Sequence, residues 1–407
     1  MKTLYKYLWF DIPETARPNA AQILVLLALS LAFCEVAQTV GFLPFTVNID
    51  ITLSVMILSI LGTSLLYKTS ISGFSIVFIL YLALNVYVTN PPAVFRSWER
   101  LFLFILLFAT VGPMFENKAS RFFRATCLNI LLVINAALAI FSFFCYFAGI
   151  NYFANFNNFV YGVGRFGGLY VHSMLLGPMA GLSSCFILWI FLRKRKTIVL
   201  VPFCLCVGAL LFSASRAALL STIIGCLVMP FISSKMTKAI KILIILGIAG
   251  TCTFPLWEDA LSGIEQKNAG NEKLGQYGSR TQKFNARLDE FKKDEIFGIG
   301  FASIDPKTGD EFNTRTGQNE PGSSWLATLS MTGIIGFMFV AVLMLKAFFR
   351  AKNSSMAYGP LAASLLAWFA VHMLFEGYIY AAGGPLCFIL WLSIAVAFDL
   401  KYIRQTA

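Results

Sequence analysis

Residues 255–324 read PLWEDALSGIEQKNAGNEKLGQYGSRTQKFNARLDEFKKDEIFGIGFASIDPKTGDEFNTRTGQNEPGSS and form the one long polar segment of the chain. The sequence on either side consists of apolar runs of about 15 to 25 residues, which are long enough to cross about 30 Å of hydrocarbon as helices. The polar segment therefore predicts one large loop between two groups of membrane spans.

Composition supports an integral membrane protein. Hydrophobic residues make up 58% of the chain and charged residues 13%, whereas soluble domains average about 25% charged residues. The mean hydropathy is +0.74. The apolar runs lack the alternation of barrel strands, so the expected class is an all-α polytopic membrane protein.

Twelve transmembrane helices are expected, and they divide the chain into three parts. An N-terminal bundle covers 1–253, a large loop with an amphipathic helix covers 254–323, and C-terminal helices cover 324–407. The expected spans are 20–40, 49–67, 71–88, 98–114, 125–149, 171–192, 197–212, 217–232, 239–253, 325–348, 356–375 and 385–400.

The distribution of Lys and Arg predicts the orientation. With both termini cytoplasmic, 19 of the 32 basic residues fall on the cytoplasmic side, four in short outer loops and nine in the large loop. Long loops translocate largely regardless of charge, so the comparison of 19 with four predicts a periplasmic large loop. The same bias accounts for the net charge of +12, and nucleic-acid binding is therefore not expected.

The cysteines and the first residues of the chain predict no further feature. The nine cysteines lie in or near apolar runs without metal-ligand spacing, so we expect neither a metal site nor a disulfide framework. Residues 1–19 are too polar for a cleavable signal peptide.

Arg216 is the strongest single candidate for a functional residue. It lies in Ser213-Ala214-Ser215-Arg216, between two spans that are too close together to leave a free loop. A charge beside hydrocarbon is costly and indicates function, and a guanidinium group binds phosphate oxygens bidentately. The alternative is an arginine that extends to the lipid headgroups.

An amphipathic helix is expected over 279–295. Phe284, Leu288 and Phe291 form one apolar stripe, and Arg280 and Arg287 flank it. The helix could lie on the membrane surface. Alternatively, the stripe packs on the bundle and directs Arg280 and Arg287 at the same anion as Arg216.

Three further residues are candidates for the site. Arg165 lies in a glycine-rich segment and could approach a phosphate closely. Glu320, just before the tenth span, is the best-placed general base, although a solvated loop glutamate has the same sequence pattern. His172 opens the sixth span as a reserve base or as a packed interfacial histidine. Other reserve acids are Asp294, Glu295, Asp305 and Glu376.

Several arginines with one carboxylate suit glycosyl transfer from a lipid diphosphate. The acceptor hydroxyl must lose its proton to a base. Negative charge grows on the departing diphosphate, and fixed arginine donors stabilise it.

Several motifs, in order, resemble the bacterial O-antigen ligase and Wzy-type polymerase superfamily. They are Ser215-Arg216-Ala217, Gly278-Ser279-Arg280, Gly298-Ile299-Gly300-Phe301, Ser323-Ser324-Trp325 and Thr332-Gly333-Ile334-Ile335-Gly336, with Arg165 ahead of them. The resemblance covers about 161–337.

The resemblance implies a GT-C-type glycosyltransferase fold and undecaprenyl-diphosphate-linked glycans as substrates, without metal, nucleotide sugar or other cofactor. It also implies that Arg216 and Arg280 bind the donor diphosphate. The implied location is the bacterial inner membrane. Chain-length regulators and flippases are further candidate partners.

One departure bears on the choice of activity. Ligases of this family usually carry a His-Asn pair just before the span that corresponds to 325–348, whereas this chain has Gly322-Ser323 there. We therefore expect an O-antigen, capsule or exopolysaccharide polymerase, with an O-antigen ligase as the alternative. A transporter of lipid-linked oligosaccharides is disfavoured, because the halves show no repeat and the polar residues concentrate in one loop.

Overall fold

The computed structural model describes residues 18–43, 48–65, 67–152, 166–232, 279–308, 313, 317, 320–355 and 358–403. Within them the α-helices are α2 (Ala21–Ala37), α3 (Ile49–Ser64), α4 (Gly73–Thr89), α5 (Ser97–Thr110), α6 (Lys118–Phe147), α8 (Ser173–Lys194), α9 (Leu200–Phe212), α10 (Arg216–Ile232), α13 (Ser279–Phe291), α14 (Ser324–Lys352), α15 (Gly359–His372) and α16 (Pro385–Ile403). Short elements are the 3-10 helices η2 (Ala93–Phe95), η3 (Thr197–Val199) and η5 (Pro306–Thr308), and the antiparallel strands β1 (Ser70–Ile71) and β2 (Phe115–Glu116).

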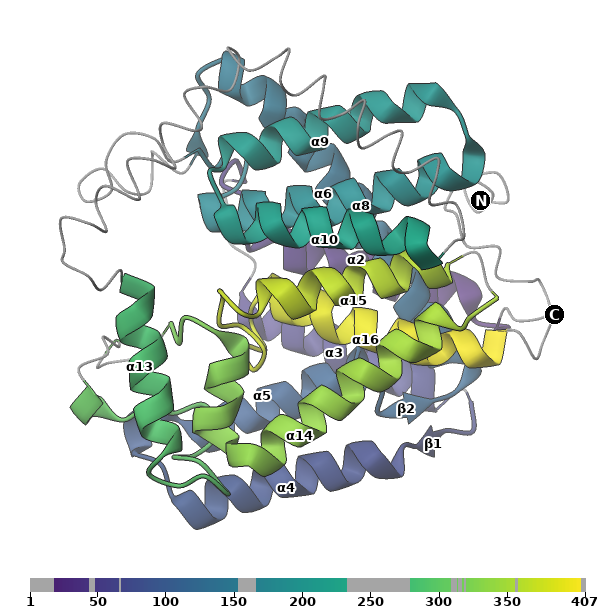
Figure 1. The fold of residues 1–407 in the computed structure, drawn as a ribbon. Helices are drawn as coiled ribbons and strands as arrows, with labels where there is room; N and C mark the ends of the chain where they lie inside the picture. The colour runs from purple at the N-terminus through teal and green to yellow at the C-terminus, as the bar shows by residue number, and fades with distance from the viewer. Residues whose placement is uncertain are drawn as a thin grey trace.

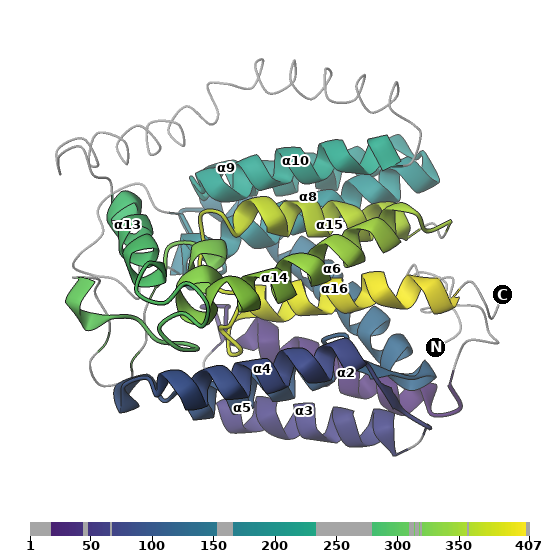
Figure 2. The same cartoon turned by 60° about the horizontal axis from the view of Figure 1, so that its bottom comes forward.

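The long apolar helices form a bundle with two distinct ends, as Figures 1 and 2 show. One end, called the α13 end below, holds α13 and the starts of α8, α10 and α14. The other end holds the start of α2 and the end of α16. Three helices, α6, α8 and α14, are long and apolar enough to cross a membrane by length and composition, and the other apolar helices are shorter.

The helices coincide with the expected spans. The span expected over 239–253 lies outside the described residues, and each of the other eleven overlaps one α-helix. The prediction was wrong about Arg121 and Arg124, which were placed in the loop after the fourth span. The fifth helix begins at Lys118 and takes in both arginines, because Asn117 caps it by accepting a hydrogen bond from Ser120 N.

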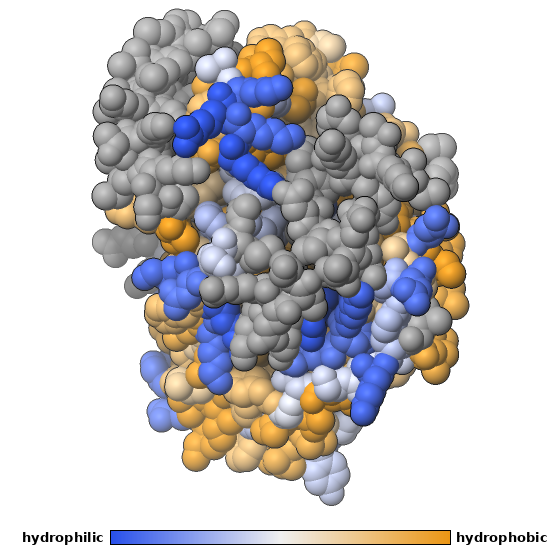
Figure 3. Space-filling view, turned by 90° about the vertical axis from the view of Figure 1, so that its right-hand side faces the viewer, coloured by the Kyte–Doolittle hydropathy of each residue, from blue (hydrophilic) through white to orange (hydrophobic). Residues whose placement is uncertain are grey.

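The surface of the bundle fits a lipid environment. Large apolar side chains such as Leu26, Leu80 and Phe141 are exposed along the flanks of the helices. Figure 3 looks onto the end opposite α13, where hydrophilic residues gather on the end face and hydrophobic residues occupy the flanks. α8 and α14 both end with basic residues in the last turn. An apolar surface between charged ends is the pattern of a membrane protein.

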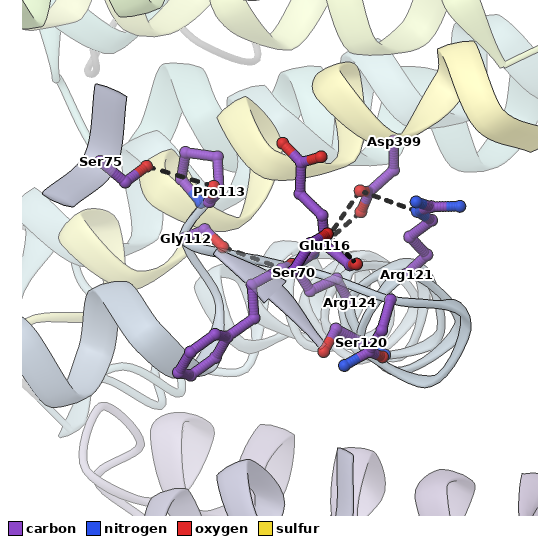
Figure 4. Close-up of polar contacts among 11 residues, drawn as sticks. Ser70, Ser75, Gly112, Pro113, Glu116, Ser120, Arg121, Arg124 and Asp399 are labelled. Atoms are coloured by element: carbon purple, nitrogen blue, oxygen red, sulfur yellow. Dashed lines mark hydrogen bonds and ion pairs between the residues drawn. The ribbon is translucent and has the colours of Figure 1, made fainter. Parts of the chain in front are cut away.

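A buried ion pair ties α6 to α16 near the end opposite α13. Arg124 Nε lies 2.8 Å and Arg124 Nη2 2.7 Å from the two carboxylate oxygens of Asp399. Arg124 Nη1 also donates to the carbonyl oxygens of Gly112 and Phe115. Figure 4 shows this cluster, with Arg121 on the same carboxylate. Sequence reasoning missed the pair, although an aspartate inside the apolar run 385–400 was a signal.

Candidate functional site

Arg216 is the first residue of α10 and is exposed at the α13 end. A tight turn positions it. Ala214 has a positive φ of 51°, and Ser213 Oγ accepts a hydrogen bond from Ser215 N at 3.3 Å. Gly177 of α8 presses on this turn, since a Cβ atom there would lie 2.6 Å from Ser215 Cβ. The close approach of α8 explains the short connection between α9 and α10.

α15 runs antiparallel to α10 and brings its last turn beside the start of that helix. Trp368 Nε1 donates to Thr222 Oγ1 at 3.0 Å, and Ser364 Oγ donates to the Gly225 carbonyl oxygen at 2.7 Å. As residue numbers rise along α15 they fall along α10. The next turn of α15, with His372, therefore lies level with the first turn of α10, which holds Arg216.

His372 is buried at the end of α15. Its ring stacks on Trp368, with centroids 4.5 Å apart, and its Nδ1 lies 3.1 Å from the Tyr378 hydroxyl. Burial raises the pKa of the Tyr378 phenol well above its usual value, so this hydroxyl stays protonated at neutral pH. This contact fixes the segment that leaves α15.

The Ser323-Ser324 motif joins the start of α14 to that same segment. Ser323 Oγ caps α14 by accepting from Leu326 N at 3.3 Å. Ser324 Oγ donates to the Glu376 carbonyl oxygen at 2.7 Å and accepts from Tyr378 N at 2.9 Å. The backbone of Glu376, a reserve acid, is therefore held beside the start of α14.

Glu320 lies on the surface at this end and pairs with α13. Its carboxylate lies 3.1 Å from Lys283 Nζ, and 54% of its side chain is exposed. Gly322 packs against the same lysine, since a Cβ atom there would lie 3.0 Å from Lys283 Cβ. The candidate base is thus held by a residue one turn away from Arg280.

The helix predicted over 279–295 is present as α13 but ends at Phe291, and a different face is buried. Ala286, Arg287 and Glu290 are buried, whereas Leu288 of the predicted stripe is 40% exposed. Arg287 Nη2 lies 2.9 Å from Glu290 Oε1, and Glu290 Oε1 accepts from Asp305 N. The buried face of α13 therefore carries this polar cluster and not the predicted apolar stripe.

The remaining predicted residues fall as follows. Arg280 lies in the first turn of α13, and its side chain is outside the described atoms. Arg287 is fully buried. His172 caps α8, its Nδ1 accepting from Met174 N at 2.9 Å. Arg165 lies outside the described residues. The structure thus brings the starts of α10 and α13 and the residue Glu320 to one end of the bundle (Figures 1 and 2).

Two of the glycine motifs, 298–301 and 332–336, lie side by side at this end. α14 is broken at Gly333, which has φ 61° and ψ −170°. The break frees two carbonyl groups, and Ile299 N donates to the Ser330 oxygen at 2.8 Å and Gly300 N to the Met331 oxygen at 3.1 Å. Neither contact was visible in the sequence, because the two motifs lie more than 30 residues apart.

Asn85 of α4 completes this junction. Its Nδ2 donates to the Phe297 carbonyl oxygen, and its Oδ1 accepts from Phe301 N at 2.8 Å. The loop that carries the Gly298–Phe301 motif is thus hydrogen-bonded to two helices, α4 and α14.

A cavity of about 420 Å³ is lined in part by Pro321, the residue after Glu320. Its walls come from α5, the start of α14, Ala302, and the segment that joins α15 to α16. Arg100 of α5 lines it and donates from Nη1 to the Ala302 carbonyl oxygen at 3.3 Å. In the sequence, Arg100 counts among the four basic residues of the short outer loops, and it is not one of the residues proposed for the site.

Among the described residues, no group of three or more His, Cys, Asp or Glu side chains has an arrangement suited to a metal ion. The groups that the site does offer are guanidinium donors, hydroxyls and one surface carboxylate. Such a set can bind an anion and accept a proton.

A comparison with protein families gave a match. Residues 201–341 match the O-antigen ligase family, a region that runs from α9 into α14 and contains Arg216, Arg280 and Glu320. A comparison with curated proteins gave no match. The match over this region supports membership of the O-antigen ligase/Wzy superfamily.

Proposed function

We propose that this protein polymerises undecaprenyl-diphosphate-linked repeat units at the periplasmic face of the bacterial inner membrane. The acceptor is the next lipid-linked unit. Its hydroxyl oxygen attacks the anomeric carbon of the donor glycan, and the bond from that carbon to the diphosphate breaks. The electron pair leaves with the diphosphate, and the hydroxyl proton passes to a base.

In this proposal the roles fall on residues of the α13 end. Arg216 and Arg280 bind the donor diphosphate, and their fixed charges stabilise the negative charge that grows on the leaving group. Glu320 accepts the proton. Arg165 and Arg287 are further candidate diphosphate ligands, although Arg287 already pairs with Glu290.

The observation that supports the proposal best is the common location of these residues. Arg216 and Arg280 are 64 positions apart, yet they begin two helices at the same end of the bundle (Figure 1). Glu320 bonds to the α13 residue one turn after Arg280. The family match spans all three positions.

The polymerase reading rests on the segment before α14. Gly322 has a positive φ of 79°, and Ser323 is occupied in capping α14 and in a hydrogen bond to the Met373 carbonyl oxygen. Neither residue can replace an acid–base histidine. An O-antigen ligase, which would move finished glycan to lipid A–core or another acceptor, is the second candidate because the matched family carries that description.

A chromosomal deletion tests the proposal. Gel separation of the surface glycan should show single-repeat caps in the deletion strain, and the full ladder should return on complementation. Long chains retained on the carrier lipid would instead indicate a ligase. Unextended units that accumulate at the cytoplasmic face would indicate a transporter, and an unchanged ladder would contradict all three.

A further inference from the structure

The cavity at the α13 end has one charged group among the described residues that line it. That group is the guanidinium of Arg100, half-buried in the first turn of α5. Its bond to the Ala302 carbonyl oxygen holds it against the wall. A guanidinium group in a cavity wall can bind an anion, because its planar donors match carboxylate and phosphate oxygens.

The rest of the lining suits a small polar molecule with apolar faces. The cavity of about 420 Å³ lies within the range of small-ligand sites, which combine apolar walls with a few polar groups. Tyr378 and Tyr380 are among the residues of the wall. The loop beyond them, Ala381-Ala382-Gly383-Gly384, has only small side chains, and a Cβ atom on Gly383 would meet nothing within 4 Å.

The position of the cavity relates it to the reaction. Pro321, the neighbour of Glu320, forms part of its wall. Pro321 is packed so tightly on Gly377 that a Cβ atom on this glycine would overlap the proline ring. A sugar in the cavity therefore lies beside the segment that carries the candidate base.

We propose that this cavity binds an anionic saccharide, with Arg100 as the residue that selects the charged group. This inference rests on the proposed glycosyl transfer and adds a substrate class to it. The anionic group has two possible sources: a carboxylate on the acceptor sugar, or the phosphate at the reducing end of a lipid-linked glycan. Both offer two oxygens that a guanidinium group can bind bidentately.

The test measures binding by saturation-transfer NMR to the purified full-length protein in lipid nanodiscs. The probes are glucuronate, glucose 1-phosphate and neutral glucose. We expect the two anions, or one of them, to bind at least about tenfold more tightly than glucose. A preference for glucuronate identifies an acidic sugar, and a preference for glucose 1-phosphate identifies the reducing end.

Four variants decide where the preference arises. Arg100→Gln should abolish it, and Gly383→Phe should weaken binding of all probes by filling the cavity while leaving Arg100 intact. The matched controls are Arg96→Gln, an exposed arginine one turn away that pairs with Glu99, and Gly73→Phe, at an open position at the start of α4. Both controls should bind like the wild type.

Three results would overturn the inference: equal binding of glucose and both anions, no binding of any probe, or a preference that survives both cavity variants. A fifth variant, Arg216→Gln, tests the donor site. If the preference for anions is lost in Arg216→Gln but kept in Arg100→Gln, the anion binds at the donor site and the inference is rejected. Binding needs no turnover, so its failure is distinct from that of the proposed function, which the glycan ladder reports.

Discussion

At the scale of single residues, the proposed role of Arg216 depends on its planar guanidinium group and not on its charge alone. A lysine keeps the charge but loses the planar pair of donors that binds two phosphate oxygens at once. We expect Arg216→Lys to lower polymer formation by at least about tenfold, as measured by the glycan ladder in a complemented deletion strain. The control is Arg96→Lys, an exposed arginine outside the site. Full activity of Arg216→Lys would remove Arg216 from the site.

The ion pair between Glu320 and Lys283 allows two roles of Glu320 to be tested separately. One is the proposed role as a base, and the other is the structural contact with α13. Glu320→Gln and Lys283→Gln break the same 3.1 Å contact, but only the first removes a proton acceptor. We expect Glu320→Gln to fold and lose about 100-fold or more of its rate, in the range of general-base catalysis. Lys283→Gln should keep most of the rate. Equal losses in the two variants would show that only the link matters.

The sequence could identify single charged residues whose position beside hydrocarbon has a high free-energy cost. Arg216 stands out because little loop separates its flanking spans, and the structure places it at a helix start, exposed at the α13 end. The position of Arg100 in a cavity wall could not be recognised, because most of that wall comes from segments about 200 residues or more away. The Arg124–Asp399 pair was missed for the same reason, with 275 positions between its members.

At the scale of elements, the break in α14 depends on Gly333. Its φ of 61° belongs to the left-handed region, and a Cβ atom would lie 2.0 Å from the Ile296 carbonyl oxygen. Gly333→Ala should therefore destabilise the protein by more than about 1 kcal/mol and lower the unfolding temperature in a thermal scan. Gly73→Ala, where a Cβ atom meets nothing, should change stability by about 0.5 kcal/mol or less. Equal unfolding temperatures for the two variants would contradict this account.

Apolar length and polar flanks predicted the helices well, because both follow from the cost of exposing backbone to lipid. The interruption at Gly333 could not be predicted, since the surrounding run is continuous and apolar. It exists because amides from residues 299 and 300 bond to the carbonyls that it frees. The face of α13 that is buried was also predicted wrongly. The prediction relied on the spacing of apolar side chains, and that spacing cannot reveal a buried Arg–Glu pair.

At the scale of the whole molecule, the Arg124–Asp399 pair fixes α6 against α16 far from the site. Breaking a buried pair leaves an uncompensated charge and costs about 3 to 5 kcal/mol. Asp399→Leu should thus lower the unfolding temperature strongly, and the double variant Arg124→Leu, Asp399→Leu should recover part of the loss. Asp289→Leu, which breaks the exposed Asp289–Lys292 pair, is the control and should have little effect. A double variant less stable than Asp399→Leu would contradict the buried-charge explanation.

The expected orientation of the bundle in the membrane can be assigned to its two ends. α8 starts beside the Arg216 turn and ends at Lys194, so it carries the chain about 33 Å to the opposite end. The basic run after it belongs to the 19 residues that predict a cytoplasmic face. Lys292, by contrast, lies just after α13 and is exposed.

Cysteine labelling tests this orientation directly. In a background with all nine native cysteines replaced, Lys292→Cys should react with a membrane-impermeant maleimide in intact spheroplasts. Lys196→Cys, exposed after the end of α8, should react only after lysis. Labelling of Lys196→Cys before lysis, with Lys292→Cys protected, would place the candidate site in the cytoplasm. That location would exclude transfer at the periplasmic face, because Arg216 and Glu320 share the end that carries Lys292.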